Sequence, residues 1–121
     1  RAMNNACAEA LDSCQQCLSA GNTVGDLFSA HEQVMKSHGF GHAALSACGY
    51  SVGIRYPPSW MDWPMIWKDN PQTLEAGMVF FLHMILLDDR TGLSMCIGET
   101  AIVTETVCEP VNRIPRTIIH N

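Results

Sequence analysis

The hydrophobic period of the chain changes close to its middle. In the first third, apolar side chains recur every three or four positions, which predicts two amphipathic helices. The first covers Ala2–Ala20 and ends at a Gly-Asn pair, which is typical of a left-handed helix cap. The second begins at Thr23, forms an approximate capping box with Asp26 and continues to about Lys36.

The second half has the composition of strands. Gly49–Tyr56 contains strand-forming residues and is halted by two prolines. Met78–Leu87 is apolar on both faces except at His83, as in a strand that is buried on both sides. Leu93–Thr104 follows as another strand, and Arg113–Ile119 closes the chain with a short β segment.

Tryptophans and prolines are concentrated between the first two predicted strands. Trp60, Trp63, Pro64, Trp67 and Pro71 form an aromatic-rich insert, which we expect to be a loop because its pattern is too irregular for a regular element. The order of these elements, two helices followed by strands, predicts an α+β fold in which the helices lie on a curved, mostly antiparallel sheet.

Composition excludes several classes of function. The 121 residues are 47% hydrophobic, which fits one globular domain or a piece of one. The net charge is −5 and the seven Lys and Arg residues are scattered, so no nucleic-acid surface is expected. No apolar run reaches transmembrane length, and no export signal follows Arg1, so we expect a cytoplasmic protein that does not interact with membranes. Because the chain opens in an apparent helix without a methionine, we expect the protein to begin upstream.

Six cysteines are present, and Cys14 and Cys17 form a C-x-x-C pair. No second pair completes a zinc site, and Cys7 and Cys14 fall on the apolar stripe of the first predicted helix. We interpret the cysteines as reduced, mostly buried thiols, with a redox or metal role as the alternative.

The segment from His38 to Trp60 is the strongest candidate for contact with a ligand. It contains two histidines, His38 and His42, followed by a glycine-rich run that suits close approach of a backbone to a bound molecule. Gly39 and Gly41 argue against a helix that would bring the histidines together as a metal-binding pair.

Four motifs together resemble one known family. They are GYSVGIRYPPSW (49–60), LEAGMVF (74–80), GETAIVTE (98–105) and IPRTII (114–119). Their order and spacing are similar to the C-terminal half of the catalytic domain in the creatinase/aminopeptidase superfamily, the pita-bread fold. The resemblance spans essentially all of residues 1–121, so it implies one half of that fold with the N-terminal part absent.

The resemblance also implies what the site has lost. Peptidases of the superfamily hold two metal ions with two aspartates, a histidine and two glutamates. In the resemblance, the two aspartates belong to a part of the domain that lies before Arg1. The position of the metal-binding histidine corresponds to Tyr50, and the positions of the two glutamates correspond to His83 and Gly98. Neutral tyrosine is a poor ligand and glycine supplies none, so we expect no dinuclear metal site on this half and no cofactor.

These departures are most similar to the branch that contains ectoine hydrolase and Xaa-Pro-dipeptidase-like relatives. The resemblance to this branch implies hydrolysis of a C–N bond in a small amino-acid-like or cyclic amidine substrate without the two metals. Such chemistry needs a proton carrier and a group that polarises the attacked carbon. His83, Glu99 and Tyr50 are the candidate catalytic residues, with His83 as the proton carrier.

Each candidate has a structural alternative. His83 could instead be a core histidine, Tyr50 could simply pack, and Glu99 could pair with Arg55 or Arg116. His42, Trp60 and Arg55 are candidate substrate-binding residues. For His42 the alternative is an exposed loop position, and for Trp60 a hydrophobic lid packed on a partner.

Three functions therefore compete at this stage. The first is the metal-independent C–N hydrolase, and the second is a metal-dependent Xaa-Pro dipeptidase or aminopeptidase with two divalent ions. The third is a degenerate, non-catalytic pita-bread module used for dimerisation or binding. Half of such a fold leaves a sheet edge and a core face uncovered, so we expect the missing N-terminal part or a second chain, as in a homodimer, to complete it.

Overall fold

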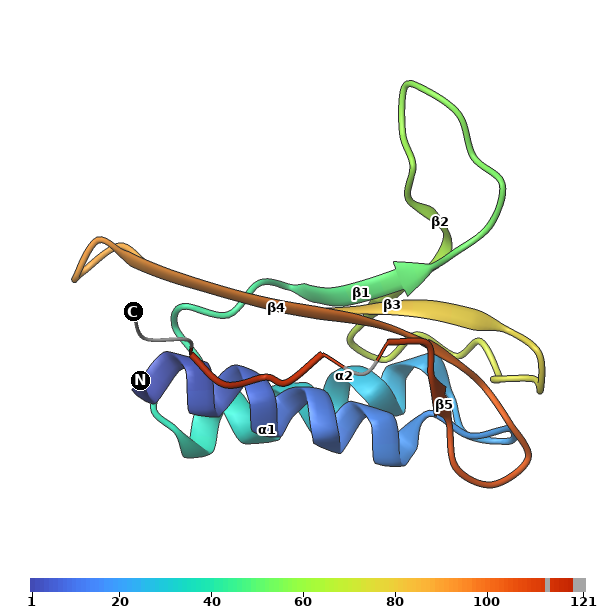
Figure 1. Ribbon diagram of the computed structural model, residues 1–121, viewed down its shortest axis with the longest axis horizontal. Coiled ribbons are helices and arrows are strands. Elements are labelled where there is room, and N and C mark those ends of the chain that lie inside the picture. Colours follow the sequence, from blue (N-terminus) through green and yellow to red (C-terminus); the bar gives the residue numbers. More distant parts are fainter. Residues whose placement is uncertain (113, 119–121) are drawn as a thin grey trace.

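The computed structural model describes residues 1–112 and 114–118, which form two helices and one five-stranded sheet (Figure 1). Helices α1 (Ala2–Cys17) and α2 (Val24–Ser37) lie against one face of the sheet. The strands are β1 (Ala47–Ser51), β2 (Asp62–Trp67), β3 (Val79–Asp88), β4 (Leu93–Ile102) and β5 (Glu109–Pro110). They follow the order β2-β1-β3-β4-β5, and each neighbouring pair is antiparallel. The predicted α+β fold is confirmed.

The two helices form where the apolar period predicts them, with one difference in length. α1 ends at Cys17 rather than Ala20, because the chain turns there and the Ala20 backbone N–H donates to Thr104 O at 2.9 Å. At the start of α2, Asp26 N donates to Thr23 Oγ1 and Thr23 N donates to Asp26 Oδ2, which confirms the capping box. Neither helix is long and apolar enough to cross a membrane.

Alternate residues of β3 face opposite sides of the sheet. Phe80, Leu82, Met84 and Leu86 are fully buried against the helices, and each stabilises the fold by about 1.5–3 kcal/mol through apolar burial. Phe81, His83 and Ile85 lie on the other side and are half-buried. We call these two sides the covered face and the open face. The predicted strand Met78–Leu87 is present, but the helices bury only one of its two faces.

Two strand predictions and one loop prediction differ from the structure. The strand expected at Gly49–Tyr56 lies at Ala47–Ser51, and residues 52–61 form no strand. Part of the tryptophan-rich insert, expected to be a loop, is strand β2. Of the predicted C-terminal segment Arg113–Ile119, residues 114–118 form no strand, and Arg113 and Ile119 lie outside the described residues.

A long connection between β1 and β2 rises from the open face, on the side away from the helices (Figure 1). We call residues 52–61 the arm. Several of its apolar side chains are largely exposed: Val52, Ile54, Tyr56, Trp60 and Met61. The C-terminal segment runs on the opposite side, beside α1 (Figure 1). The sheet therefore separates two environments: a packed helical layer and an open face with a projecting arm.

Candidate active site

A row of rings crosses the open face from β1 to β3. Tyr50 lies opposite Phe81 in the strand register, and their ring centroids are 5.5 Å apart. The Phe81 and His83 centroids are 4.9 Å apart, with the rings tilted by 49°. The structure therefore brings two of the predicted catalytic residues, Tyr50 and His83, to the same surface, with Phe81 between them.

Two glycines allow these rings to lie where they do. A Cβ on Gly98 would stand 2.4 Å from Cζ of Phe81, so the ring occupies the space over that glycine. A Cβ on Gly49 would stand 2.4 Å from the Phe81 carbonyl oxygen, at a position where the register between β1 and β2 is irregular. At Gly49 the obstacle includes backbone, so a side chain there would require the strands to move, whereas at Gly98 the obstacle is the Phe81 ring itself. The glycine at 98, which removes a metal ligand in the family pattern, thus provides room for Phe81.

His83 has a polar neighbour that the sequence did not reveal. Its Nε2 lies 2.9 Å from Sγ of Cys96, which projects from β4 on the open face. In the register His83 is opposite Gly98, so Cys96 is its diagonal neighbour two residues along the strand. In the sequence, Cys96 stands two residues before Gly98, so the two positions share a face of the strand. This spacing identifies Cys96 as a neighbour of His83 only when the register between β3 and β4 is known.

Burial shifts both members of this contact toward their neutral forms. Partial removal from water lowers the pKa of His83 and raises the pKa of Cys96. The neutral imidazole has one ring nitrogen free to accept a proton, and the neutral thiol can donate to it. In the resting site both groups are therefore uncharged, with the thiol as donor and the imidazole as acceptor.

The arm adds Trp60 to the ring row. Trp60 Nε1 donates to Tyr50 Oη at 3.2 Å. Arg55, the predicted substrate-binding cation, is exposed in the arm and donates from Nε to Asp62 Oδ1 at 3.0 Å. Its side chain thus stiffens the arm, and its partner is Asp62 rather than Glu99.

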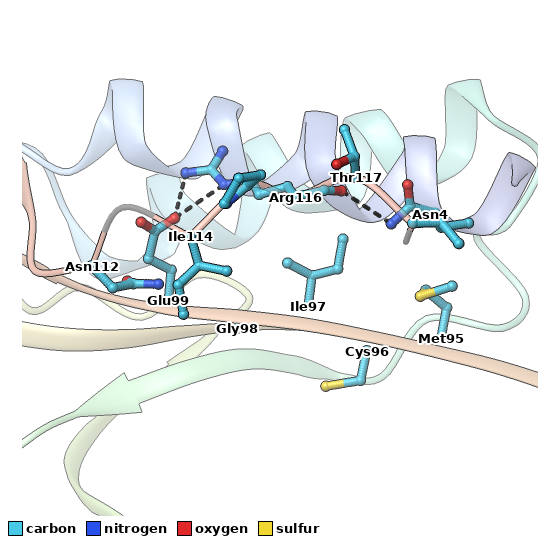
Figure 2. A pocket seen from close by; sticks show the side chains of 12 residues that line it. Asn4, Met95, Cys96, Ile97, Gly98, Glu99, Asn112, Ile114, Arg116 and Thr117 are labelled. Carbon is cyan, nitrogen blue, oxygen red and sulfur yellow. Dashed lines mark hydrogen bonds and ion pairs between the residues drawn. The ribbon is translucent and has the colours of Figure 1, made fainter. Parts of the chain in front are cut away.

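Glu99 lies on the covered face, away from the other catalytic candidates. In Figure 2 its side chain points toward the helices, whereas Cys96 points the other way. The carboxylate is 6% exposed and accepts hydrogen bonds from Arg116 Nε at 3.1 Å and from Gln15 Nε2 at 3.2 Å. Of the alternatives weighed for this residue, the ion pair with Arg116 is the one that the structure contains.

Arg116 ties the C-terminal segment to the helical layer. Besides Glu99 it contacts Gln15 at 2.9 Å and Asp12, and its carbonyl oxygen accepts from Asn4 Nδ2 at 3.3 Å. These contacts border a pocket of about 240 Å³ between β4 and the C-terminal segment (Figure 2). Three of its lining residues, Asn4, Glu99 and Arg116, already take part in hydrogen bonds within the protein, which indicates a structural role.

The two histidines of the H-x-x-x-H motif do not join the site. His38 Nε2 lies 2.7 Å from Glu9 Oε2 on α1. His42 Nε2 lies 3.4 Å from Asp88 Oδ1, and the ring also contacts Arg90, near the far end of β3. The structure does not bring His42 to Tyr50 and His83, so its predicted contact with substrate has no geometric support among the described residues.

The donor set on the open face does not fit a dinuclear metal centre. The places that the family pattern gives to metal ligands hold Tyr50, His83 and Gly98, of which the first is a phenol, a poor metal ligand, and the last has no side chain. Among residues 1–112 and 114–118, no three His, Cys, Asp or Glu side chains are grouped so that they could hold a metal ion. No step is therefore assigned to a metal on this half.

Comparison with known proteins places these features in context. The model of metallopeptidase family M24 matches residues 1–105. The ectoine hydrolase of Halomonas elongata is 31% identical over 115 residues, which are 94% of this chain and 28% of that protein. The Xaa-Pro dipeptidase of Pyrococcus furiosus is 23% identical over 99 residues, or 82% of this chain and 27% of that protein.

Solved structures show the same fold. The X-Pro aminopeptidase of Thermotoga maritima superposes with a TM-score of 0.85 at 21% identity, over 95% of this chain and 31% of that one. The prolidase of Pyrococcus furiosus gives 0.83 at 20% identity, over 93% and 32%. The chain thus spans about 30% of the length of these relatives.

Proposed function

This chain belongs to the metallopeptidase family M24, the pita-bread superfamily of the sequence resemblance, and from that premise we propose a metal-independent hydrolase. The reaction is cleavage of a C–N bond in a small amino-acid-like or cyclic amidine compound. The observation that carries the proposal is the placement of Tyr50 and His83 on one open face, where the family pattern would put metal ligands. The similarity to an ectoine hydrolase supports this substrate class.

The open face supplies the groups that such a reaction needs. Hydrolysis of a C–N bond requires a base that removes a proton from the attacking nucleophile and an acid that protonates the leaving nitrogen. A neutral imidazole at His83 can do both in turn, because the proton it accepts is the one it returns. Tyr50 Oη can donate a hydrogen bond to charge that develops on the attacked group, with Phe81 as the apolar floor between them.

Glu99 has a different place in this proposal. Its carboxylate is committed to Arg116 and Gln15 on the covered face, so we assign it to fixing the C-terminal segment rather than to the reaction. Trp60, hydrogen-bonded to Tyr50, is left as the wall of the site, and its exposed indole face suits an apolar or cationic substrate.

The open face also supports a proposal about what completes the site. The ring row and the apolar arm stay uncovered by the described residues, while the chain spans about 30% of its relatives. We propose that these 121 residues are the C-terminal part of the catalytic domain. The remainder of that domain or a second chain, as in a homodimer, would cover the open face.

Light scattering of residues 1–121 alone tests this proposal. Association of the fragment is expected, and a stable monomer would contradict the proposal.

The experiment is a substrate screen with matched variants of the whole protein. Cyclic amidines, N-acylated diamino acids and Xaa-Pro dipeptides are assayed with and without a chelator, and metal content is measured on the same samples. Turnover of an amidine or amide that survives the chelator, with a loss of about 100-fold in His83→Gln, supports the proposal. His38→Gln, which alters an exposed histidine bound to Glu9, is the control.

Other outcomes point to the alternatives. Two bound ions per chain and activity that the chelator abolishes would favour the metal-dependent Xaa-Pro peptidase. Absence of turnover on all three substrate classes would favour a non-catalytic module.

A further inference from the structure

On the open face, Sγ of Cys96 is in direct contact with Nε2 of His83. We propose that Cys96 is the nucleophile of the site and that His83 is its general base. This inference rests on the proposed C–N hydrolase and names the atom that attacks the substrate.

The geometry is that of a preset nucleophile and base. Sγ of Cys96 lies 2.9 Å from Nε2 of His83, within reach for direct proton transfer. Phe81 packs on the imidazole at a centroid distance of 4.9 Å, so the ring is held between an apolar wall and the thiol. Because Nε2 faces the thiol, it can accept the proton when the tautomer carries its own proton on Nδ1.

Access distinguishes Cys96 from the other cysteines. All six lie among the described residues, and four of them, Cys7, Cys14, Cys48 and Cys108, are buried. Cys14 is further occupied by donation to Leu27 O at 3.3 Å, and Cys17 is half-buried. Cys96 is the exposed thiol of the described chain, and it lies on the same face as the ring row.

The neighbourhood of Cys96 leaves room for a substrate on the open face. The next residue on that side of β4 is Gly98, which has no side chain, and Phe81 covers it as a flat apolar surface. A planar amide or amidine group can lie on this ring with its carbon turned toward Sγ. The thiol, the imidazole and the apolar floor come from two adjacent strands, which are rigid supports for a reacting group.

The covalent step balances with water as the co-reactant, here for an amide. Sγ–H gives its proton to His83 Nε2 as sulfur bonds to the carbonyl carbon. The imidazolium then protonates the leaving nitrogen as the C–N bond breaks, which releases an amine and leaves a thioester on Cys96. Water attacks the thioester carbon and gives a proton to Nε2; the C–S bond breaks, and the proton returns to sulfur with release of the acid.

Thiol reactivity tests the pair without any knowledge of the substrate. The whole protein is treated with limiting iodoacetamide, and alkylation of each cysteine is followed by peptide mass spectrometry. We expect Cys96 to react at least about tenfold faster than Cys17, and His83→Gln to slow Cys96 about tenfold while His38→Gln leaves it unchanged. Thermal unfolding of both variants shows that they are folded. Equal rates at Cys96 in His83→Gln and wild type would overturn the assignment of the base.

The hydrolysis assay tests the nucleophile itself, with a substrate from the screen above. Cys96→Ser is expected to lose at least about 100-fold in turnover, and Cys17→Ser to lose none. Acid quenching during turnover should leave the acyl group of the substrate on the Cys96 peptide. If Cys96→Ser keeps full activity while His83→Gln loses it, the nucleophile is refuted and the hydrolase stands. If no substrate is cleaved, both the hydrolase and its nucleophile fail, even where Cys96 alkylation depends on His83.

Discussion

The two faces of the sheet differ in the burial and in the partners of their polar side chains. On the covered face, the Glu99 carboxylate is nearly buried and is bound by Arg116 and Gln15. On the open face, His83 is half-buried and its neighbours are a thiol and an aromatic ring. A buried charge with two partners stabilises a fold, whereas a neutral base beside a thiol is available for chemistry. The two residues are separated by one step in the strand register, and this step places them on opposite faces of the sheet.

The largest expected effect comes from comparing two apolar side chains on opposite faces of β3, Leu82 and Ile85. Leu82→Ala opens a cavity in the covered face and should lower the free energy of unfolding by about 3 kcal/mol. Ile85→Ala, a matched truncation on the half-buried open face, should cost no more than about 1 kcal/mol. Chemical denaturation of both variants measures the difference. Both variants are made in residues 1–121 alone, without the part that is proposed to cover the open face, and equal losses there would contradict the difference between the two faces.

Acid should destabilise the helical layer through His31. This residue of α2 is 1% exposed, and burial lowers its pKa from 6.5 to about 4. Since the fold favours neutral His31, its contribution is complete above pH 6.5 and is lost as the pH falls toward 4, by about 3 kcal/mol in all. His31→Phe should flatten the stability curve across this window, whereas exposed His38→Gln should not. A slope unchanged in His31→Phe would contradict burial as its cause.

The helical layer was the part of the fold most accessible from sequence. Its apolar stripe and the Thr23–Asp26 box are local patterns, and both helices were found from them. β2 was missed because Pro64 and the tryptophans obscure the alternation. A proline is tolerated there because β2 is an edge strand, whose position depends on the order of the whole sheet.

The candidate site could be predicted only in part, because it too depends on how the strands pair in the sheet. The resemblance indicated Tyr50 and His83, and the structure brings them to one face. In Met78–Leu87 both the odd-numbered and the even-numbered positions are mostly apolar. The sequence therefore could not show which side of β3 faces the helices. It therefore could not separate Glu99 from His83, nor show that Cys96 lies beside the histidine. Those facts follow from the register that pairs His83 with Gly98.

A smaller effect is expected when the ion pair on the covered face is broken. Arg116→Met leaves the Glu99 carboxylate with fewer partners and should cost about 2 kcal/mol of stability. The double variant Arg116→Met, Glu99→Gln should recover part of this loss, because no buried charge is then left unpaired. Chemical denaturation of the wild type, the two single variants Arg116→Met and Glu99→Gln, and the double variant measures the coupling. Simple addition of the two single effects would show that the pair has no energetic role.

The smallest expected effect on stability is at Gly98, under the Phe81 ring. Gly98→Ala places a methyl group against that ring and should cost about 1 kcal/mol while it displaces the floor of the site. Adding Phe81→Leu should relieve the clash. Stability and turnover of the single and double variants provide the measurement. A Gly98→Ala protein with unchanged turnover would show that the position of the Phe81 ring does not matter for substrate.

The separation of roles between the two faces is tested most directly by paired kinetics of His83→Gln and Glu99→Gln. Turnover of a substrate from the screen is measured per folded molecule, beside the free energy of unfolding of each variant. We expect His83→Gln to lose about 100-fold in turnover with little change in stability, and Glu99→Gln to lose stability with turnover kept. Loss of turnover in Glu99→Gln, with His83→Gln fully active, would contradict the assignment of chemistry to the open face.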